Sequence, residues 1–412
     1  MTFRSVVRMS VSLDLQGSTR SLGTLAWSAR DRVAFFEFDA DFIRSPLPVS
    51  PFNLRVGVGL IRAERTFEGL HGLFNDSLPD GWGRLLVDRQ LQRAGIRPAG
   101  ITPLDRLSAV GSAGMGALTY VPEVDATRRG PDDLDWFVDQ VAAVQAERPA
   151  AELDELQGAQ GGAAGARPKI MIGFNPGRQT FILDYGAPLP EGYEHWLVKA
   201  RAQDDHRDIC AEEHAYALMA RAAGVLMAET RVLVTGQGRR LFATRRFDRT
   251  GRGRLHMHTA SGLLNASHRE PALDYEDLHK LTAALTRDSR QVVQLFRHMV
   301  FNVLARNRDD HAKNFAYLMD ADGKWQLSPA YDLTWSSGIA GQHTTAIAGE
   351  GLNPRPGHLL EVARRAAIPQ RQAADVIDQV RSAIARWRQF ADEAGLVAAR
   401  ALEVDHDLSA SR

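Results

Sequence analysis

The chain has 412 residues, of which 44% are hydrophobic and 24% charged, with 50 basic and 50 acidic side chains. This length predicts two or three structural units with a sizeable core, and the balanced charge gives no general sign of nucleic-acid binding. The single cysteine, Cys210, excludes intrachain disulfides and thiolate metal clusters. Because the N-terminus lacks the apolar core of a signal peptide and no apolar run approaches about 18 residues, we expect a cytoplasmic chain without membrane contact.

The first third of the chain mixes strand and helix signals. Residues 11–38 alternate apolar and polar side chains, which predicts a small antiparallel sheet. After a run of turn residues at 75–83 comes an arginine-rich amphipathic helix. The sequence then becomes polar and acidic at 126–157, where Asp133 is expected to cap another helix. We therefore predict a first unit of mixed α and β structure at residues 1–125.

The middle of the chain predicts a sheet, and the remainder is mostly helical. Short apolar runs separated by turn residues predict strands at 170–174, 180–183, 196–199, 230–234 and 241–244. A helix is expected at 210–223, where the apolar residues share one face and Gly224 provides a C-terminal cap. We therefore predict a strand-rich lobe at 126–250 and a helical lobe at 251–412.

The strongest chemical signal follows a buried helix. Apolar residues repeat at three- and four-residue spacing over 294–305, and the next nine residues, Arg306–Asn314, are almost entirely polar. A predicted hairpin comes next, with strands at 315–319 and 325–327, and Asp332 lies just behind it. Protein kinases have this order of elements around the transferred phosphate, and their Asp-x-x-x-x-Asn spacing matches Asp309 and Asn314.

The residue types in this segment suit phosphoryl transfer. Mg²⁺ prefers hard oxygen ligands, which Asp332 and the Asn314 amide would provide. Asp309 would accept or orient the proton of a substrate hydroxyl. Lys313 could help to neutralise phosphate charge, whereas His311 fits a buried, hydrogen-bonded scaffold residue better than a metal ligand. A solvated charged loop is the alternative interpretation when Asp309, Asp310 and His311 are taken alone.

Two further features concern the phosphates. Lys199 ends a predicted buried strand, a position that is unfavourable unless a phosphate or Glu213 on the next helix pairs it. A surface lysine whose stem lies along the protein is the alternative. The glycine-rich stretch at 158–169, which includes Gly162, Ala163 and Ala164, precedes the sheet. It could form a lid over the phosphates, and a flexible linker is the alternative.

Several segments together resemble the HipA family of bacterial toxin kinases. They are Gly165–Lys169, Trp196–Lys199, Arg246–Arg249, Asn307–Phe315, Pro329–Asp332, Phe74–Asp80 and Gly111–Gly116. The resemblance spans most of the chain and implies an α+β, distantly protein-kinase-like fold of two lobes with an N-terminal mixed α/β subdomain.

The same resemblance implies roles for individual residues and requires ATP and Mg²⁺. Asp309 would be the catalytic base, Asn314 and Asp332 would bind Mg²⁺, and Lys199 would contact the ATP phosphates. Lys169 would join the glycine-rich lid on the nucleotide. The stretch Thr244 to Phe247, with Arg246 and Phe247, would lie beside the adenine.

The family resemblance also implies a biological setting. It predicts a Ser/Thr protein kinase toxin paired with a small helix-turn-helix antitoxin of the HipB kind, which faces the unit 1–125 and binds DNA, so that this chain meets DNA only indirectly. Family targets are aminoacyl-tRNA synthetases, whose phosphorylation arrests growth and leads to persistence. The alternatives are a small-molecule phosphotransferase, a two-metal phosphohydrolase using Asp309, Asp310, His311 and Asp332, or a weakly active corepressor partner of the antitoxin. Against the phosphohydrolase, His256 and His258 are expected on an exposed strand or turn and not at a metal site.

The glycine-rich stretch departs from the family pattern in one respect. The family loop usually carries a serine that is autophosphorylated, which shuts the kinase off. Residues 158–169 contain no hydroxyl group. We therefore expect no autophosphorylation in this loop, and any such modification should map elsewhere, such as to Ser108 or Ser112.

Overall fold

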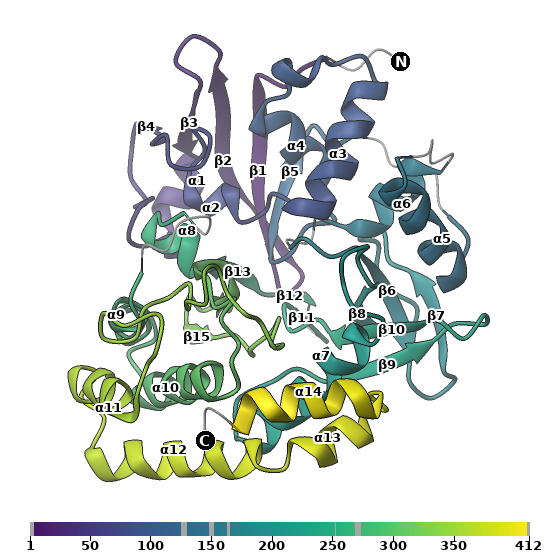
Figure 1. Cartoon of the computed structure of the whole chain (residues 1–412). Coiled ribbons are helices and arrows are strands. Elements are labelled where there is room, and N and C mark those ends of the chain that lie inside the picture. The colour runs from purple at the N-terminus through teal and green to yellow at the C-terminus, as the bar shows by residue number, and fades with distance from the viewer. Residues whose placement is uncertain are drawn as a thin grey trace.

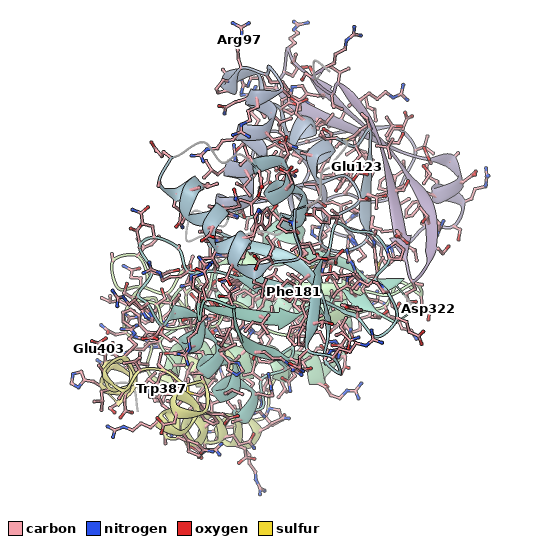
Figure 2. All side chains as sticks on the ribbon, turned by 90° about the vertical axis from the view of Figure 1, so that its right-hand side faces the viewer. Arg97, Glu123, Phe181, Asp322, Trp387 and Glu403 are labelled. Carbon is pink, nitrogen blue, oxygen red and sulfur yellow. The ribbon has the colours of Figure 1, made fainter. Side chains whose placement is uncertain are left out.

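The computed structural model describes residues 4–124, 130–147, 152–162, 165–251, 253–267 and 273–409 (Figure 1). Two five-stranded sheets, a three-stranded sheet and a two-stranded ribbon are combined with helices, so the predicted α+β class is confirmed. Seen from the side, Arg97 lies at one end of the molecule, and Trp387 and Glu403 lie at the other (Figure 2). Within the described ranges, no helix is long and apolar enough to cross a membrane.

The first sheet forms the N-terminal part of the molecule. Its strands are β1 (Arg8–Leu15), β2 (Ser18–Ser28), β3 (Val33–Phe38), β4 (Leu60–Arg62) and β5 (Leu118–Val121), in the order β4-β3-β2-β1-β5. All neighbours are antiparallel, as the alternating sequence predicts. The helices of this part are α1 (Ala40–Arg44), α2 (Gly72–Asn75), α3 (Gly81–Arg93), α4 (Pro103–Val110) and the 3-10 turn η1 (Pro98–Gly100).

The second sheet has helices on both faces. Its strands are β6 (Lys169–Asn175), β7 (Thr180–Leu183), β8 (Glu194–Lys199), β9 (Thr230–Val234) and β10 (Arg240–Arg245), in the order β7-β6-β8-β10-β9. Leu241 and Ala243 share a core with α5 (Leu134–Gln145) and α6 (Leu153–Gln160). Phe242 points the opposite way and packs with Cys210 at the start of α7 (Ile209–Ala222). Cys210 is a buried free cysteine, and burial raises the pKa of its thiol to about 11.

The C-terminal part is largely helical. Its helices are α8 (Ala260–Leu264), α9 (Tyr275–Thr286), α10 (Ser289–Leu304), α11 (Pro356–Arg365), α12 (Gln370–Ile384), α13 (Trp387–Glu393), α14 (Ala398–Ser409) and the 3-10 turn η2 (Ala312–Asn314). Its strands are β13 (His256–Thr259), β14 (Ala316–Met319) and β15 (Trp325–Leu327), preceded by the ribbon β11 (Arg249–Thr250) and β12 (Gly253–Arg254). The predicted helix and hairpin around the polar loop are confirmed. The unit boundaries at 125 and 250 stay predictions.

Two expectations about local structure require correction. The histidines of β13 were expected on an exposed strand or turn, but His256 and His258 are fully buried because the N-terminal part covers that strand. The glycine-rich stretch 158–169 was expected to be a lid or a flexible linker, but residues 158–160 are the last residues of α6. The turn begins only at Gly161, whose left-handed backbone (φ 62°) caps that helix.

Asp76 fastens the N-terminal part to the rest of the protein. This carboxylate follows α2 and accepts hydrogen bonds from the Thr259 backbone N–H at 2.6 Å and the Thr259 hydroxyl at 2.8 Å. It also bonds His258 Nδ1 at 2.5 Å, and the other ring nitrogen of His258 bonds the Ser50 hydroxyl at 3.0 Å. Burial excludes water from this cluster, so its polar atoms depend on one another.

Replacing Asp76 should therefore destabilise the whole chain. Asp76→Ala leaves the donors of His258 and Thr259 buried without an acceptor, and we expect a loss of about 3 kcal/mol in unfolding free energy. Urea unfolding followed by circular dichroism would measure it. As a matched control, Asp378→Ala removes an aspartate that is 73% exposed and pairs with Arg381. It should change the unfolding free energy by less than about 1 kcal/mol. Equal, small losses in both variants would contradict the fastening role.

Candidate active site

The polar loop is held against the end of a buried helix. Helix α10 carries Phe296, Met299 and Val300 into the core and ends at Leu304, and the Tyr216 hydroxyl donates to the carbonyl of Ala305 at 2.9 Å. The loop thus leaves a rigid element at a defined point. Of its polar residues, Asp309 is exposed, Arg306, Arg308 and His311 are half-buried, and the others are buried.

Asp310 is the buried anchor of the loop. Its carboxylate accepts from the Tyr275 hydroxyl at 2.9 Å and the Thr344 backbone N–H at 2.8 Å, and it bonds His343 Nδ1 at 2.9 Å. The side chain is completely buried. A carboxylate enclosed by so many donors holds the loop in place and has no free face for a metal ion.

Asp309 has the opposite environment. Its side chain is 62% exposed, and His311 Nε2 lies 3.9 Å from its carboxylate. The pKa of Asp309 is raised, first because neighbouring protein atoms remove part of its water and then because Asp332 and Asp310 are nearby negative charges, while His311 acts in the opposite sense. An outward-facing carboxylate with a raised pKa suits proton transfer at a substrate hydroxyl.

Asn314 and Asp332 flank this carboxylate. The Asn314 side-chain amide donates to the Asp309 carbonyl at 2.7 Å, an orientation that leaves the amide oxygen to act as a ligand. Asp332 has left-handed backbone geometry, with a φ of 54°, which aspartate tolerates better than most residues. Before it, the Tyr331 hydroxyl donates to the Lys313 carbonyl at 2.5 Å, which ties the Asp332 turn to the loop.

Lys199 joins the sheet to the helical lobe. Its ammonium lies 2.5 Å from Glu213 Oε1 on α7, and it also contacts the Asp332 carboxylate. Lys199 is only 6% exposed, so the predicted pairing with Glu213 is confirmed and the surface alternative was wrong. Burial opposes the charge of Lys199, but Asp332 and Glu213 outweigh it and raise its pKa. Burial acts to raise the pKa of Asp332, but the neighbouring cations Lys199, Lys169 and Arg167 overcome this effect and hold the pKa well below its usual range.

A second buried lysine stands opposite the first. Lys169 begins β6 and is the direct register partner of Lys199 on β8. Like charges directly opposite each other in a sheet repel. Lys169 is 2% exposed, and burial, together with Lys199, lowers its pKa to about 8 although Asp332 acts to raise it. A concentration of positive charge at one point of a sheet is suited to bind an anion.

The glycine-rich turn lies directly over Lys169. Gly165 has a φ of 111°, and a Cβ atom there would lie 2.3 Å from the Lys169 ammonium. Glycine at this position therefore lets the turn approach the lysine. Gly162 is part of the turn, while Ala163 and Ala164 lie outside the described residues. Unlike the loop of ordinary kinases, this turn connects helix α6 to strand β6.

Two site residues were not predicted from the sequence. Arg167 lies 3.1 Å from Asp205 and 3.3 Å from Glu213, beside the two lysines. Asp80, which precedes α3, pairs with the buried Lys313 ammonium at 2.6 Å. The position of Arg167 between Gly165 and Lys169 was an available signal. For Asp80 there was none, because its partner lies 233 residues away in sequence.

Arg246 and Phe247, the residues expected beside the adenine, both contact other side chains of the protein. The Arg246 guanidinium is buried and donates to Asp248 at 3.0 and 2.9 Å, so a nucleotide contact from this residue would have to come from its backbone. Phe247 packs against Tyr331 with ring centroids 5.6 Å apart, next to Asp332. Its place beside the nucleotide stays a prediction.

The two serines suggested for autophosphorylation have different environments. Ser108 is buried and donates to the Asp105 carbonyl at 2.8 Å, so it is inaccessible in the folded chain. That expectation requires correction, because the sequence did not reveal that α4 packs this face inward. Ser112 is partly exposed and lies 3.2 Å from Glu123.

The chemistry of Asn314 and Asp332 fits a magnesium ion. An amide oxygen and a carboxylate held ionised are both hard oxygen donors. Within the described part of the chain, no group of three His, Cys, Asp or Glu side chains could hold a metal ion. A divalent ion here would therefore take its other ligands from phosphate oxygens and water, as nucleotide-bound Mg²⁺ does.

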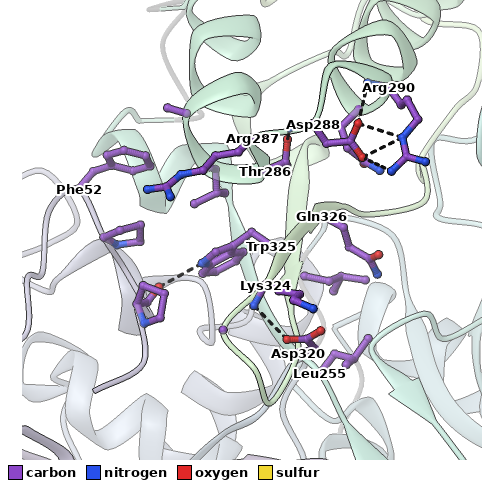
Figure 3. A pocket seen from close by; sticks show the side chains of 17 residues that line it. Phe52, Leu255, Thr286, Arg287, Asp288, Arg290, Asp320, Lys324, Trp325 and Gln326 are labelled. Atoms are coloured by element: carbon purple, nitrogen blue, oxygen red, sulfur yellow. Dashed lines mark hydrogen bonds and ion pairs between the residues drawn. The ribbon is translucent and has the colours of Figure 1, made fainter. Parts of the chain in front are cut away.

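A separate cavity lies away from these residues. It has a volume of about 720 Å³ and opens between the β14–β15 hairpin, the α9–α10 turn and the segment at Pro48 to Phe52 (Figure 3). Trp325, Arg287 and Lys324 are among its lining residues, and none of the predicted site residues is. The cavity is therefore not the candidate active site.

The chain matches models of two known protein domains. The model of the HipA-like C-terminal domain matches residues 161–387, and that of the HipA N-terminal domain matches residues 13–121. Y4dM, a protein of Sinorhizobium fredii that carries a provisional kinase name, is 26% identical over 208 residues, covering 47% of this chain. The chain spans about half the length of that curated relative, with 50% covered.

Solved structures share the fold. HipA in the HipA, HipB and operator DNA complex of Shewanella oneidensis MR-1 superposes with a TM-score of 0.70 at 18% identity, covering 97% of this chain and 95% of that chain. The fold expectation of a kinase-like arrangement of two lobes with an N-terminal subdomain is thereby confirmed. The likeness to the Helicobacter pylori proinflammatory kinase CtkA is slight, with a TM-score of 0.34 at 14% identity over 51% of this chain and 92% of that chain. Because one family model covers more than half of the sequence, the chain belongs to the HipA family.

Proposed function

We propose that this chain is an ATP- and Mg²⁺-dependent Ser/Thr protein kinase. The observation that carries the proposal is Lys199, which is buried between Glu213 and Asp332. In kinases, a sheet lysine paired with a helix glutamate holds the ATP phosphates, and an aspartate nearby binds Mg²⁺, the role proposed here for Asp332. Asp309 and Asn314 lie on one loop, where the Asn314 amide donates to the Asp309 carbonyl.

Each residue would contribute one part of the transfer. Lys199 and Lys169 would bind the phosphates, and the turn at Gly165 would cover them. Asp309 would take the proton of the attacking hydroxyl as its oxygen bonds to the γ-phosphorus and ADP leaves. Mg²⁺, held by Asn314 and Asp332, would neutralise charge on the phosphate oxygens.

We further propose the setting that the family suggests. The chain would be the toxin of a toxin-antitoxin pair, with a HipB-like helix-turn-helix antitoxin as partner and contact with DNA through that partner. The similar Shewanella protein is bound to HipB and operator DNA, which supports this proposal. An aminoacyl-tRNA synthetase is the proposed substrate, whose modification would arrest growth. The enclosed carboxylate of Asp310 counts against a two-metal phosphohydrolase.

The role of Asp309 can be tested with labelled ATP. Transfer of γ-phosphate into the proteins of a bacterial extract should fall by about 10²- to 10⁴-fold in Asp309→Ala, because a positioned base contributes that much. ATP binding, measured by calorimetry, should persist. Asp322→Ala makes the same chemical change at an exposed hairpin turn and should leave transfer unchanged.

The outcomes of this experiment separate the alternatives. One labelled band of synthetase size, absent with Asp309→Ala, would support the protein kinase and deliver its target. Label that enters only small molecules would indicate a small-molecule phosphotransferase. ATP binding with no transfer to any acceptor would contradict the kinase proposal and favour a corepressor.

Nucleotide affinity should depend on pH through Lys169. Its pKa in the free protein is lowered to about 8, so the ammonium is charged below that pH and neutral above it. Bound phosphates would favour the charged form of Lys169. The affinity for Mg-ATP should therefore be highest below pH 8 and should fall as the pH rises above it. The Kd of Mg-ATP should increase about tenfold between pH 7.5 and 9. Lys169→Arg keeps its charge and should remove the dependence, whereas an identical profile in Lys169→Arg would rule out this lysine as its source.

A further inference from the structure

The segment that follows Asp332 lies against the proposed catalytic loop, which is the polar segment Arg306–Asn314, on both sides of Asp309. This segment, residues 333–355, which we call the strap, contains no named helix or strand. The Ser336 backbone N–H donates to the Arg306 carbonyl at 3.0 Å, and the Thr344 backbone N–H donates to the Arg308 carbonyl at 3.2 Å. Asp310 bonds His343 and Thr344 as well. The position of the strap and that of Asp309 are therefore coupled.

Arg308, which immediately precedes Asp309, carries its side chain under the strap. Its Nη1 lies 3.4 Å from the Ser337 carbonyl, a long contact. At Gly338 (φ 68°) a Cβ atom would lie 2.1 Å from the Gln342 carbonyl oxygen and 2.8 Å from the Arg308 Cβ, so glycine lets the strap turn tightly and still lie close to this arginine. Arg308 Nε is buried and has no hydrogen-bond partner among the described residues.

The guanidinium of Arg308 also makes no ion pair within the described residues, and only the more distant Asp310 and Asp407 act on its charge. Among the described residues, no carboxylate lies within 4 Å of it. Burial and the neighbouring Arg306 lower its pKa, although Asp310 acts to raise it. Asp310 is already enclosed by its own donors. A buried donor beside a second arginine, with no acceptor of its own, is the kind of site that a dianion fills.

One strap hydroxyl is placed to supply that anion. The strap has five Ser and Thr residues, which are Thr334, Ser336, Ser337, Thr344 and Thr345. Thr334 and Thr345 are buried, and the hydroxyls of Ser336 and Thr344 hydrogen-bond within the site. Ser337 is exposed, and its hydroxyl makes only a 3.5 Å contact with the next carbonyl.

We propose that Ser337 is a phosphorylation site and that Arg308 is the receptor for its phosphoryl group. The transfer would form a bond between Ser337 Oγ and the γ-phosphorus of ATP, break the bond to the β-phosphate oxygen, and release ADP and a proton. The bound phosphoryl group then fixes the strap on the catalytic loop, as phosphorylated loops do when they pair with arginine. The effect on catalysis rests on the proposed kinase function, whereas the binding of phosphoserine by Arg308 does not.

Hydrogen exchange tests the receptor without any activity measurement. Phosphoserine is incorporated during translation at position 337, and exchange of the Ser336 and Thr344 amides is followed by mass spectrometry. We expect exchange in the strap to slow by about tenfold relative to the unmodified chain. Phosphoserine at the exposed position of Ser382 on α12 adds the same charge elsewhere and should leave the strap unchanged.

The role of Arg308 is isolated by a second variant. Arg308→Gln keeps a planar amide but removes the charge, and it should abolish the protection that phosphoserine at 337 gives. Unchanged strap exchange on modification at 337, or protection that survives Arg308→Gln, would overturn the proposal.

The origin of the phosphate is tested by expressing the chain in bacteria and mapping its phosphopeptides by mass spectrometry. Phosphate on Ser337 in the parent chain but not in Asp309→Ala indicates self-modification, and phosphate in both indicates another kinase. No phosphate on Ser337 in either chain would overturn the assignment of a modification site, even where labelled transfer to an extract protein upholds the kinase.

Discussion

The repulsion between two buried lysines is the constraint that organises this protein. Lys169 and Lys199 face each other across neighbouring strands of one sheet, and both are almost completely buried. Such a pair is stable only when carboxylates approach from outside the sheet. Glu213 comes from α7 and Asp332 from the helical lobe, so neutralising the lysines also fixes how the lobes meet. A phosphate chain entering this point would meet charge that is already concentrated and oriented.

The N-terminal subdomain takes part in the same site. Asp80 pairs with Lys313 of the catalytic loop, and a Cβ atom at Gly81 would lie 2.7 Å from the backbone of Ala166 in the glycine-rich turn. The subdomain thus touches both structures that would enclose a nucleotide. Asp76 secures it through His258 and Thr259. The turn residues at 75–80 therefore contact the proposed catalytic loop, although they lie far from it in sequence.

Within the proposed catalytic loop, two adjacent aspartates with the same side chain differ in burial and therefore in role. Asp310 is enclosed by donors from α9 and the strap, and it holds the loop in place. Asp309 is left facing outward with its carboxylate free for a proton. The strap is held by the residues on either side of Asp309, so an event that tightens the strap would also restrain Asp309, the proposed base, without contacting it.

Much of the fold was predictable because its signals are local. Apolar periodicity of 2 or 3.6 residues located the strands, the helix before the catalytic loop and the hairpin after it. The kinase spacing selected Asp309, Asn314 and Asp332 from the sequence alone. The cost of a buried lysine predicted a partner for Lys199, either a phosphate or Glu213, and the structure shows the pair with Glu213. By contrast, the sequence placed β13 at the surface, because alternation marks a strand without revealing what covers it.

The sequence by itself therefore determined the family, the order of elements and the residue types that phosphoryl transfer needs. Tertiary structure alone decided which charges meet. Lys169 opposite Lys199, Asp80 on Lys313, Arg167 beside Glu213 and Arg308 beneath the strap all join segments whose separation along the chain carries no local signal. Local patterns depend on bonds between near neighbours, whereas the pairing of buried charges depends on which surfaces packing brings together and closes to water.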